Sequence, residues 1–148
     1  MKIKDFLSAS DVAIDMRAVD KAGLLEQLSG RAAAAMNLSR DTVVSEIEKR
    51  DELGSTGIGH GVCIPHARLR EVNKPFGLVA RLHSPVEFNA IDGVPVDIVF
   101  LLLLPAASQL DQLNALAAVA RKLRDADVLR KVRGATSTTE LYRAVTAG

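Results

Sequence analysis

The residues best suited to do chemistry lie in the segment Gly54–Arg68, which has the sequence GSTGIGHGVCIPHAR. It holds four of the chain's ten glycines. Because glycine lacks a Cβ, such a segment can bend sharply and turn its N–H groups toward an anion. Ser55 and Thr56 add hydroxyl groups as further donors. The pattern predicts an anion-binding loop that leads into a short strand and then into His66.

His66 is the predicted reactive residue, because a neutral imidazole has a nucleophilic lone pair near neutral pH. Pro65 restricts the backbone before it, and Arg50 and Arg68 would disfavour the protonated ring. A phosphoryl group on His66 would carry a charge of about −1.5 to −2, which guanidinium and loop N–H groups could match. The alternatives are a structural or solvated histidine and ordinary surface charge at both arginines.

The spacing of His60, Cys63 and His66 raises the alternative of a metal site. Gly61 and Pro65 disfavour a helix, so the segment should be extended, with Cys63 on the opposite face from both histidines. The histidines would then lie roughly 20 Å apart, too far for one ion that is bound at about 2 Å. The same argument disfavours a Cys63–His66 nucleophile pair, and Cys63 is expected to be buried.

Two helices are predicted before the glycine segment. Asp20 is a suitable N-cap for the first, whose apolar residues recur at helical spacing up to Met36. Ser39 caps the second helix, which ends before Gly54. Its last turn carries Arg50, which should therefore reach the mouth of the glycine loop.

The strongest strand pattern is Val96–Leu104, a nearly continuous apolar run between two prolines. A core helix is the alternative, but the length and the bounding prolines favour a central strand that is buried on both faces. Such burial requires helices on both sides, so the sequence predicts an α/β fold. Weaker strand patterns occur at Val12–Met16, at the sheet edge, and at Val62–Ile64, Phe76–Leu82 and Val86–Phe88, with a turn at Ser84-Pro85.

Three further helices are predicted after the central strand. Ser108 begins the first, whose expected apolar stripe comprises Leu113, Leu116, Ala117, Ala120 and Leu123. Gln112 lies in its first turn, beside the stripe and away from open solvent. A short helix follows at Ala126–Lys131, and Ser137 with Glu140 caps the last helix, which extends through Val145.

Length and composition indicate one globular domain that spans residues 1–148. The chain is 48% hydrophobic and 25% charged, which is ordinary for a soluble protein. A net charge of +1 and 3% aromatic residues do not support a nucleic-acid partner. The single cysteine, the absence of an apolar leader and the lack of an apolar run near about 20 residues predict a cytoplasmic protein without membrane insertion.

The central motif resembles the phosphohistidine motif of bacterial phosphotransferase-system IIA domains of the fructose–mannitol class. The matching residues are Arg50, Gly54-Ser55-Thr56-Gly57-Ile58-Gly59, Gly61-Val62 and Ile64-Pro65-His66-Ala67. The run Val99–Pro105 and the helix after it extend the likeness over nearly the whole chain, whose length is most similar to the nitrogen-regulatory branch. Cys63 stands where the family usually has alanine, and Gln112 stands where many members have a second active-site histidine.

The resemblance implies a phosphocarrier that accepts a phosphoryl group on Nε2 of His66 from a phosphorylated HPr-like carrier. It implies that Arg50 assists the transfer and that the phosphate is held by Ser55, Thr56, Gly57, Arg68 and Gln112. It also implies a mixed sheet of about five strands with helices on both faces, and neither a metal nor a cofactor.

The resemblance further implies that the protein has a regulatory role of the nitrogen or potassium type. Its phosphorylation state would then signal to a target protein. The alternative is a sugar-transport component that passes the phosphoryl group to a separate IIB protein. A third hypothesis, from a different class, is a binding module in which His66 is structural and is never phosphorylated.

Overall fold

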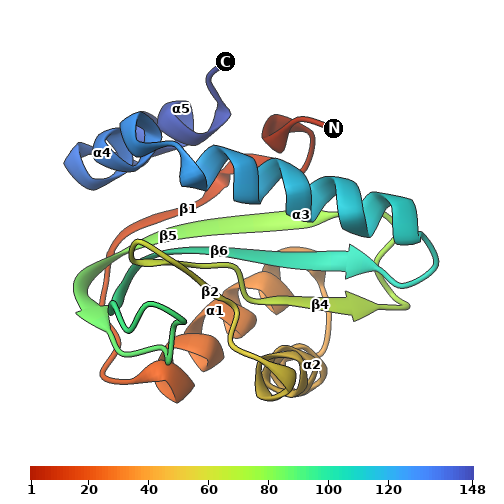
Figure 1. The fold of residues 1–148 in the computed structure, drawn as a ribbon. Coiled ribbons are helices and arrows are strands. Elements are labelled where there is room, and N and C mark those ends of the chain that lie inside the picture. Colours follow the sequence, from red (N-terminus) through yellow and green to blue (C-terminus); the bar gives the residue numbers. More distant parts are fainter.

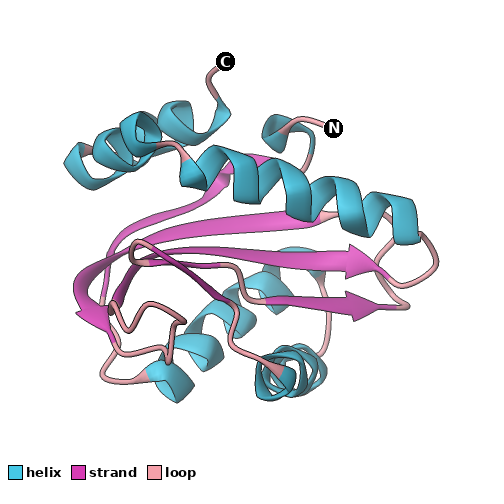
Figure 2. Cartoon of the chain, viewed as in Figure 1, coloured by secondary structure: helices cyan, strands magenta, loops and turns pink.

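The structure, a computed structural model that describes residues 1–148, has one mixed β-sheet between two layers of helices (Figure 1; Figure 2). One face is covered by α1 (Lys21–Met36) and α2 (Arg40–Leu53). The other face is covered by α3 (Gln109–Arg124), α4 (Ala126–Gly134) and α5 (Thr138–Thr146). None of these helices combines the length and the apolar character needed to cross a membrane.

The sheet has six strands, where the family resemblance implied about five. They are β1 (Leu7–Met16), β2 (Gly57–Gly59), β3 (Val62–Cys63), β4 (His66–Leu69), β5 (Phe76–Val86) and β6 (Val96–Pro105), and a short 3-10 turn at Ile3–Asp5 precedes them. The strand order is β1-β5-β6-β3-β2, and β4 also pairs with β6. Strand β5 is antiparallel to β6, whereas β3 and β4 are parallel to it.

The central strand β6 contributes to two separate cores. Val99, Leu101 and Leu103 pack in the core that contains α1 and α2. The alternate residues Ile98, Phe100, Leu102 and Leu104 pack in the core that contains α3, α4 and α5. This alternation follows from the two-residue period of a strand. The predicted α/β fold and the burial of this strand on both faces are confirmed.

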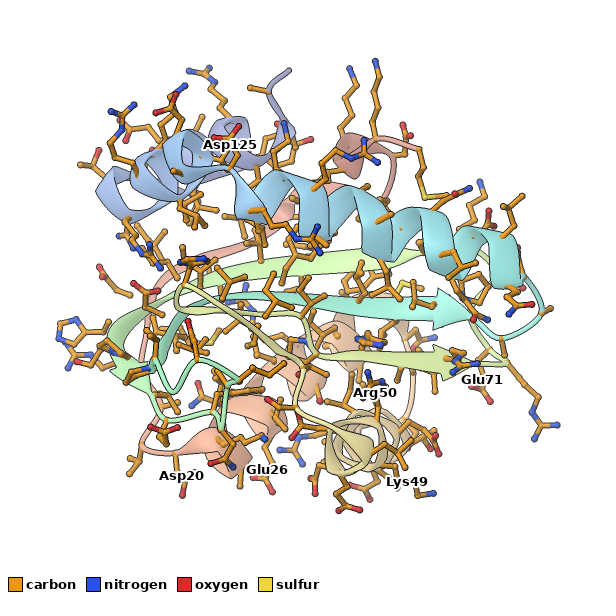
Figure 3. The ribbon with its side chains drawn as sticks, in the orientation of Figure 1. Asp20, Glu26, Lys49, Arg50, Glu71 and Asp125 are labelled. Atoms are coloured by element: carbon orange, nitrogen blue, oxygen red, sulfur yellow. The ribbon has the colours of Figure 1, made fainter.

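The predicted N-caps begin the helices in the structure. At the start of α1, α2, α3 and α5, the side chains of Asp20, Ser39, Ser108 and Ser137 accept a hydrogen bond from the N–H group three residues later, over 2.8, 3.4, 3.2 and 3.1 Å. Each bond satisfies an N–H that has no partner within its helix. Figure 3 labels Asp20 and also Asp125, which caps α4 in the same way.

Two strands differ from the prediction. The sequence predicted separate strands on either side of Ser84-Pro85, but β5 continues through this dipeptide. The pairing of β5 with β6 shifts register between Arg81 and Val86, and such a bulge accommodates a proline that has no N–H to donate. Strand β1 lies at the sheet edge as predicted, but it begins at Leu7 rather than at Val12.

The buried face of α3 also differs from the prediction. Leu113, expected in the apolar stripe, is 60% exposed, and Ala117 is exposed as well. The residues that are buried are Gln112, Ala115, Ala118, Val119 and Leu123. Alanines lie on several sides of this helix, so apolar spacing alone did not distinguish the face that packs on the sheet.

Both ends of the chain lie beside the layer formed by α3, α4 and α5 (Figure 1). Met1, Lys2, Ala147 and Gly148 line a common cavity of about 310 Å³ together with residues of α3. Helix α2 lies across the sheet from this layer (Figure 1).

Candidate functional site

The imidazole of His66 is partly buried at the first residue of β4 and has a different partner at each nitrogen. Its Nδ1 lies 2.8 Å from the carbonyl oxygen of Ile64, and its Nε2 lies 3.2 Å from Nε of Arg50. A carbonyl oxygen only accepts and a guanidinium nitrogen only donates, so Nδ1 carries the proton and Nε2 presents its lone pair. The two hydrogen-bond partners thus indicate the neutral tautomer with its proton on Nδ1, in which Nε2 is the nucleophilic atom.

The surroundings of His66 lower its pKa below the ordinary value. Burial of the ring is the largest cause, and the charges of Arg50 and Arg68 act in the same direction. The hydrogen bond to the Ile64 carbonyl acts in the opposite direction but is outweighed. Since each lowering cause disfavours the imidazolium, the ring is neutral near pH 7 and its lone pair is available.

Arg50 extends from the last turn of α2 toward the sheet (Figure 3). Besides its bond to His66, it donates through Nη1 to the carbonyl of Gly54 over 3.0 Å. Val43 and Ile47 lie on the same helical face and are fully buried, so their packing sets the rotation of α2 that directs Arg50 to the imidazole. The guanidinium has five N–H groups, which leaves further donors for a ligand at Nε2.

His66 lines a cavity of about 170 Å³ between α2 and β4. Its lining consists of Glu46, Lys49, Arg50, Leu53, His66, Ala67 and Arg68. His66 and Arg68 are two residues apart in β4 and therefore project to the same side of the strand. Lys49 pairs with Glu46 over 3.4 Å. The cavity therefore offers the positive charge of two guanidinium groups to an anion at the imidazole.

The polar groups of the glycine loop are bonded within the protein. Ser55 Oγ donates to the carbonyl of Phe88 over 3.2 Å and accepts the N–H of Gly57 over 3.1 Å. The Oγ1 hydroxyl and the N–H of Thr56 both donate to Oδ1 of Asp51, over 3.1 and 3.2 Å. None of these bonds reaches the imidazole, so in this structure they hold the loop itself in place, and phosphate binding by Ser55, Thr56 and Gly57 stays a prediction.

Gln112 is buried at the start of α3, sheltered from solvent as the sequence predicted. Its Nε2 donates to the carbonyl of Pro105 over 2.9 Å and to that of Ala106 over 3.4 Å. These bonds close the turn between β6 and α3. Gln112 makes no hydrogen bond with His66 and does not line the cavity beside it.

Lys21, Asp51 and Phe88 support the loop but were missed by the sequence analysis. The one local signal that could have identified Asp51 is its position directly after Arg50, in the helix that ends at the loop. Lys21 and Phe88 lie far away in the sequence, and no spacing marks them.

Cys63 is fully buried as predicted, and burial raises the pKa of its thiol well above the ordinary value. His60 lies at the exposed tip of the turn between β2 and β3, with a positive φ of 58°. The structure contains no group of three or more His, Cys, Asp or Glu side chains placed to hold a metal ion.

Known proteins are similar to this chain over most of its length. The model of the family described as "Phosphoenolpyruvate-dependent sugar phosphotransferase system, EIIA 2" matches residues 5–147. The nitrogen regulatory protein of Bradyrhizobium diazoefficiens is 38% identical over 142 residues, which cover 96% of this chain and 93% of that protein. The nitrogen regulatory protein of Escherichia coli is 41% identical over 123 residues, which cover 82% and 76%. The crystal structure of nitrogen regulatory protein IIA-Ntr from Neisseria meningitidis has a TM-score of 0.92 at 32% identity and covers 97% of this chain and 99% of its own.

Proposed function

The chain belongs to the EIIA 2 family of the phosphoenolpyruvate-dependent sugar phosphotransferase system, and we propose that it is a phosphocarrier that accepts a phosphoryl group on His66. The observation that carries this proposal is the pair of bonds at the imidazole. The carbonyl of Ile64 holds the proton on Nδ1, so the lone pair of Nε2 lies beside Arg50. An imidazole held in this way is a neutral nucleophile whose product charge already has a counterion.

The proposed reaction is an exchange of one phosphorus–nitrogen bond for another. The lone pair of Nε2 of His66 attacks the phosphorus of a phosphohistidine on an HPr-like carrier. The new P–N bond forms as the old one breaks, and the donor imidazole leaves with the electron pair. Because the two bonds are similar in energy, the main requirement is alignment of the two rings, which raises the effective concentration of the reacting atoms.

Arg50 and Arg68 are the side chains best placed to hold the transferred group. As the P–N bond forms, Nε2 loses its lone pair, so the guanidinium of Arg50 is released to donate to phosphate oxygens. Arg68 projects to the same side of β4 as His66 and adds a second cation. The hydroxyl and N–H groups of the glycine loop and the side-chain amide of Gln112 would contact the phosphoryl group only after breaking their present hydrogen bonds.

The proposed role is regulatory, with the phosphorylation state of His66 signalling to another protein. Relatives called nitrogen regulatory proteins support this role, since they match most of the chain at 38% and 41% identity. The family description, which names a sugar phosphotransferase system, favours a second candidate: a sugar-transport component that hands the phosphoryl group to a separate IIB protein. Both candidates use the same chemistry at His66 and differ in the recipient.

The test is incubation of the protein with phosphoenolpyruvate and the general phosphotransfer proteins, followed by measurement of the intact mass. The parent protein is expected to gain one acid-labile phosphoryl group, and His66→Gln is expected to gain none. His60→Gln is the matched control, because His60 is an exposed histidine in the same segment and should leave the gain unchanged. A phosphorylated His66→Gln protein, or an unmodified parent, would contradict the proposal.

A further inference from the structure

Lys21 and Asp51 form a salt bridge beneath the glycine loop, and the chemistry proposed above gives it no role. The side chain of Asp51 is only 8% exposed and that of Lys21 is 23% exposed. A carboxylate so far removed from water needs a cation and hydrogen bonds to remain charged. Lys21 begins α1 and Asp51 lies near the end of α2, so the pair joins the two helices next to the site.

Asp51 is connected to His66 through two intermediate residues, Thr56 and Ile64, each of which is hydrogen-bonded on both sides. Its Oδ1 accepts the N–H and the hydroxyl of Thr56, over 3.2 and 3.1 Å. The carbonyl of Thr56 accepts the N–H of Ile64 over 2.9 Å. The carbonyl of Ile64 in turn accepts Nδ1–H of His66 over 2.8 Å. The N–H and the carbonyl of Ile64 belong to adjacent peptide groups, so the carboxylate of Asp51 helps to position the backbone segment whose carbonyl holds the imidazole.

Lys21 also contacts Phe88 in the loop between β5 and β6, to which the glycine loop is bonded. Its Nζ lies 3.4 Å from the carbonyl oxygen of Phe88, to which it donates, and 4.5 Å from the centre of the Phe88 ring. The hydroxyl of Ser55 donates to this same carbonyl over 3.2 Å. The ammonium group of Lys21 thus connects Asp51 to the β5–β6 loop. These two partners of Lys21 hold adjacent residues of the glycine loop: Asp51 accepts from Thr56, and the Phe88 carbonyl accepts from Ser55.

We infer that Asp51 and Lys21 are a positioning pair, which keeps the imidazole of His66 in the orientation and tautomer that phosphoryl transfer requires. Neither residue lines the cavity at His66, so both act through other groups. The pair holds Thr56, Thr56 holds Ile64, and the Ile64 carbonyl keeps the proton on Nδ1. The inference rests on the proposed function where it concerns transfer, but its statement about the imidazole holds for the unphosphorylated protein as well.

The experiment compares Asp51→Asn with Glu52→Gln, which removes the same charge from the neighbouring, exposed position of α2. Nitrogen NMR shifts of the His66 ring report the tautomer in the unphosphorylated protein. Quenched-flow mixing with a phosphorylated HPr-like carrier reports the transfer rate. Asp51→Asn is expected to mix the two tautomers and to slow transfer about tenfold, because small misplacements of reacting atoms have large effects on rate. Glu52→Gln is expected to match the parent in both measurements.

A double variant, Lys21→Met with Asp51→Leu, guards against the cost of an unpaired buried charge and also removes the oxygen that accepts from Thr56. It is expected to keep the tautomer defect, whereas Lys21→Arg, which retains the positive charge, is expected to behave like the parent. The inference would be overturned if Asp51→Asn showed the tautomer and the transfer rate of the parent. If Asp51→Asn does not fold, a parent-like tautomer in the double variant would overturn it instead. If the parent itself takes no phosphoryl group, the proposed function fails, and the NMR comparison still decides whether the pair orients His66.

Discussion

At the scale of single residues, the two ring nitrogens of His66 have partners of opposite character. The Ile64 carbonyl accepts from Nδ1 and the Arg50 guanidinium donates to Nε2. The two partners fix the tautomer of the neutral ring and place the nucleophilic atom beside positive charge, while burial is the main cause of the lowered pKa. Donors that are already oriented are most effective where charge develops during a reaction, as it does on a phosphoryl group in transfer.

Replacement of Arg50 by alanine should slow phosphoryl transfer far more than it lowers stability. The loss of one oriented donor is expected to raise the activation free energy by about 2–4 kcal/mol. The free energy of unfolding should fall by less than about 1 kcal/mol, because Arg50 is only partly buried and makes few bonds. Transfer rates and urea unfolding measure the two effects. The control is Arg130→Ala, a 72% exposed arginine in α4, and an equal rate in the two variants would contradict the role of Arg50.

The lowered pKa of His66 predicts how stability depends on pH. Burial, the main cause, disfavours the charged ring in the folded protein, so the unfolded chain binds the proton first. As the pH falls through about 6.5, the parent should therefore lose stability relative to His66→Gln, and the loss should continue down to the pKa of the folded state. Above that range the difference should be constant. Urea unfolding of both proteins across this pH range measures the difference, and no change would show that folding leaves the pKa of His66 unshifted.

At the scale of elements, the β2–β3 hairpin that precedes the site rests on the loop between β5 and β6. Asp92 accepts the N–H of His60 over 2.9 Å, and Phe88 accepts the hydroxyl of Ser55. A Cβ on Gly57 would lie only 2.8 Å from Cβ of Ala90. The β5–β6 loop therefore supports the β2–β3 hairpin, and this hairpin leads directly into β4, the strand that carries His66.

Replacement of Gly57 by alanine should disturb this contact. The new methyl group would also lie 3.1 Å from Cα of Ala90, so one loop must move. We expect the free energy of unfolding to fall by about 1–3 kcal/mol, as is usual for overpacking. Gly54→Ala is the matched control, because nothing lies within 4 Å of its Cβ and its φ of 167° is extended. That variant should stay within about 1 kcal/mol of the parent. Equal stabilities by urea unfolding would show that the two loops do not depend on each other.

Helix starts and the position of Arg50 could be predicted from the sequence because both are local. A cap bonds an N–H group three residues away, and a helical face follows from spacing alone. The continuity of β5 through Pro85 and the pairing of His66–Leu69 as β4 depend on β6, which is distant in sequence. The Lys21–Asp51 pair likewise depends on how α1 packs against α2, so no local pattern indicated it.

At the scale of the whole molecule, β6 is shared by the two cores. Leu101 is fully buried against α1 and α2, and its neighbour Leu102 is fully buried in the opposite core. A loss of packing on either side therefore removes support from the same strand. The two helical layers should unfold together, because neither has a sheet of its own.

Replacement of Leu101 by alanine is expected to lower the free energy of unfolding by about 2–5 kcal/mol. Tyr142 is the chain's single tyrosine and packs against the other core, so its fluorescence reports the layer that the substitution does not touch. In urea, this signal and far-UV circular dichroism should shift to the same new midpoint. Leu102→Ala provides the reciprocal comparison, and separate midpoints would show that the layers unfold independently.

The neighbouring positions of the two chain ends make the molecule suitable for tethering. Met1 and Gly148 line one cavity beside α3, whereas Arg50 and the helix that carries it lie across the sheet. A protein immobilised through either end would therefore turn its histidine toward the bulk solution. Arrival and departure of a carrier protein could then be recorded on a sensor surface, with the attachment point kept away from the docking event.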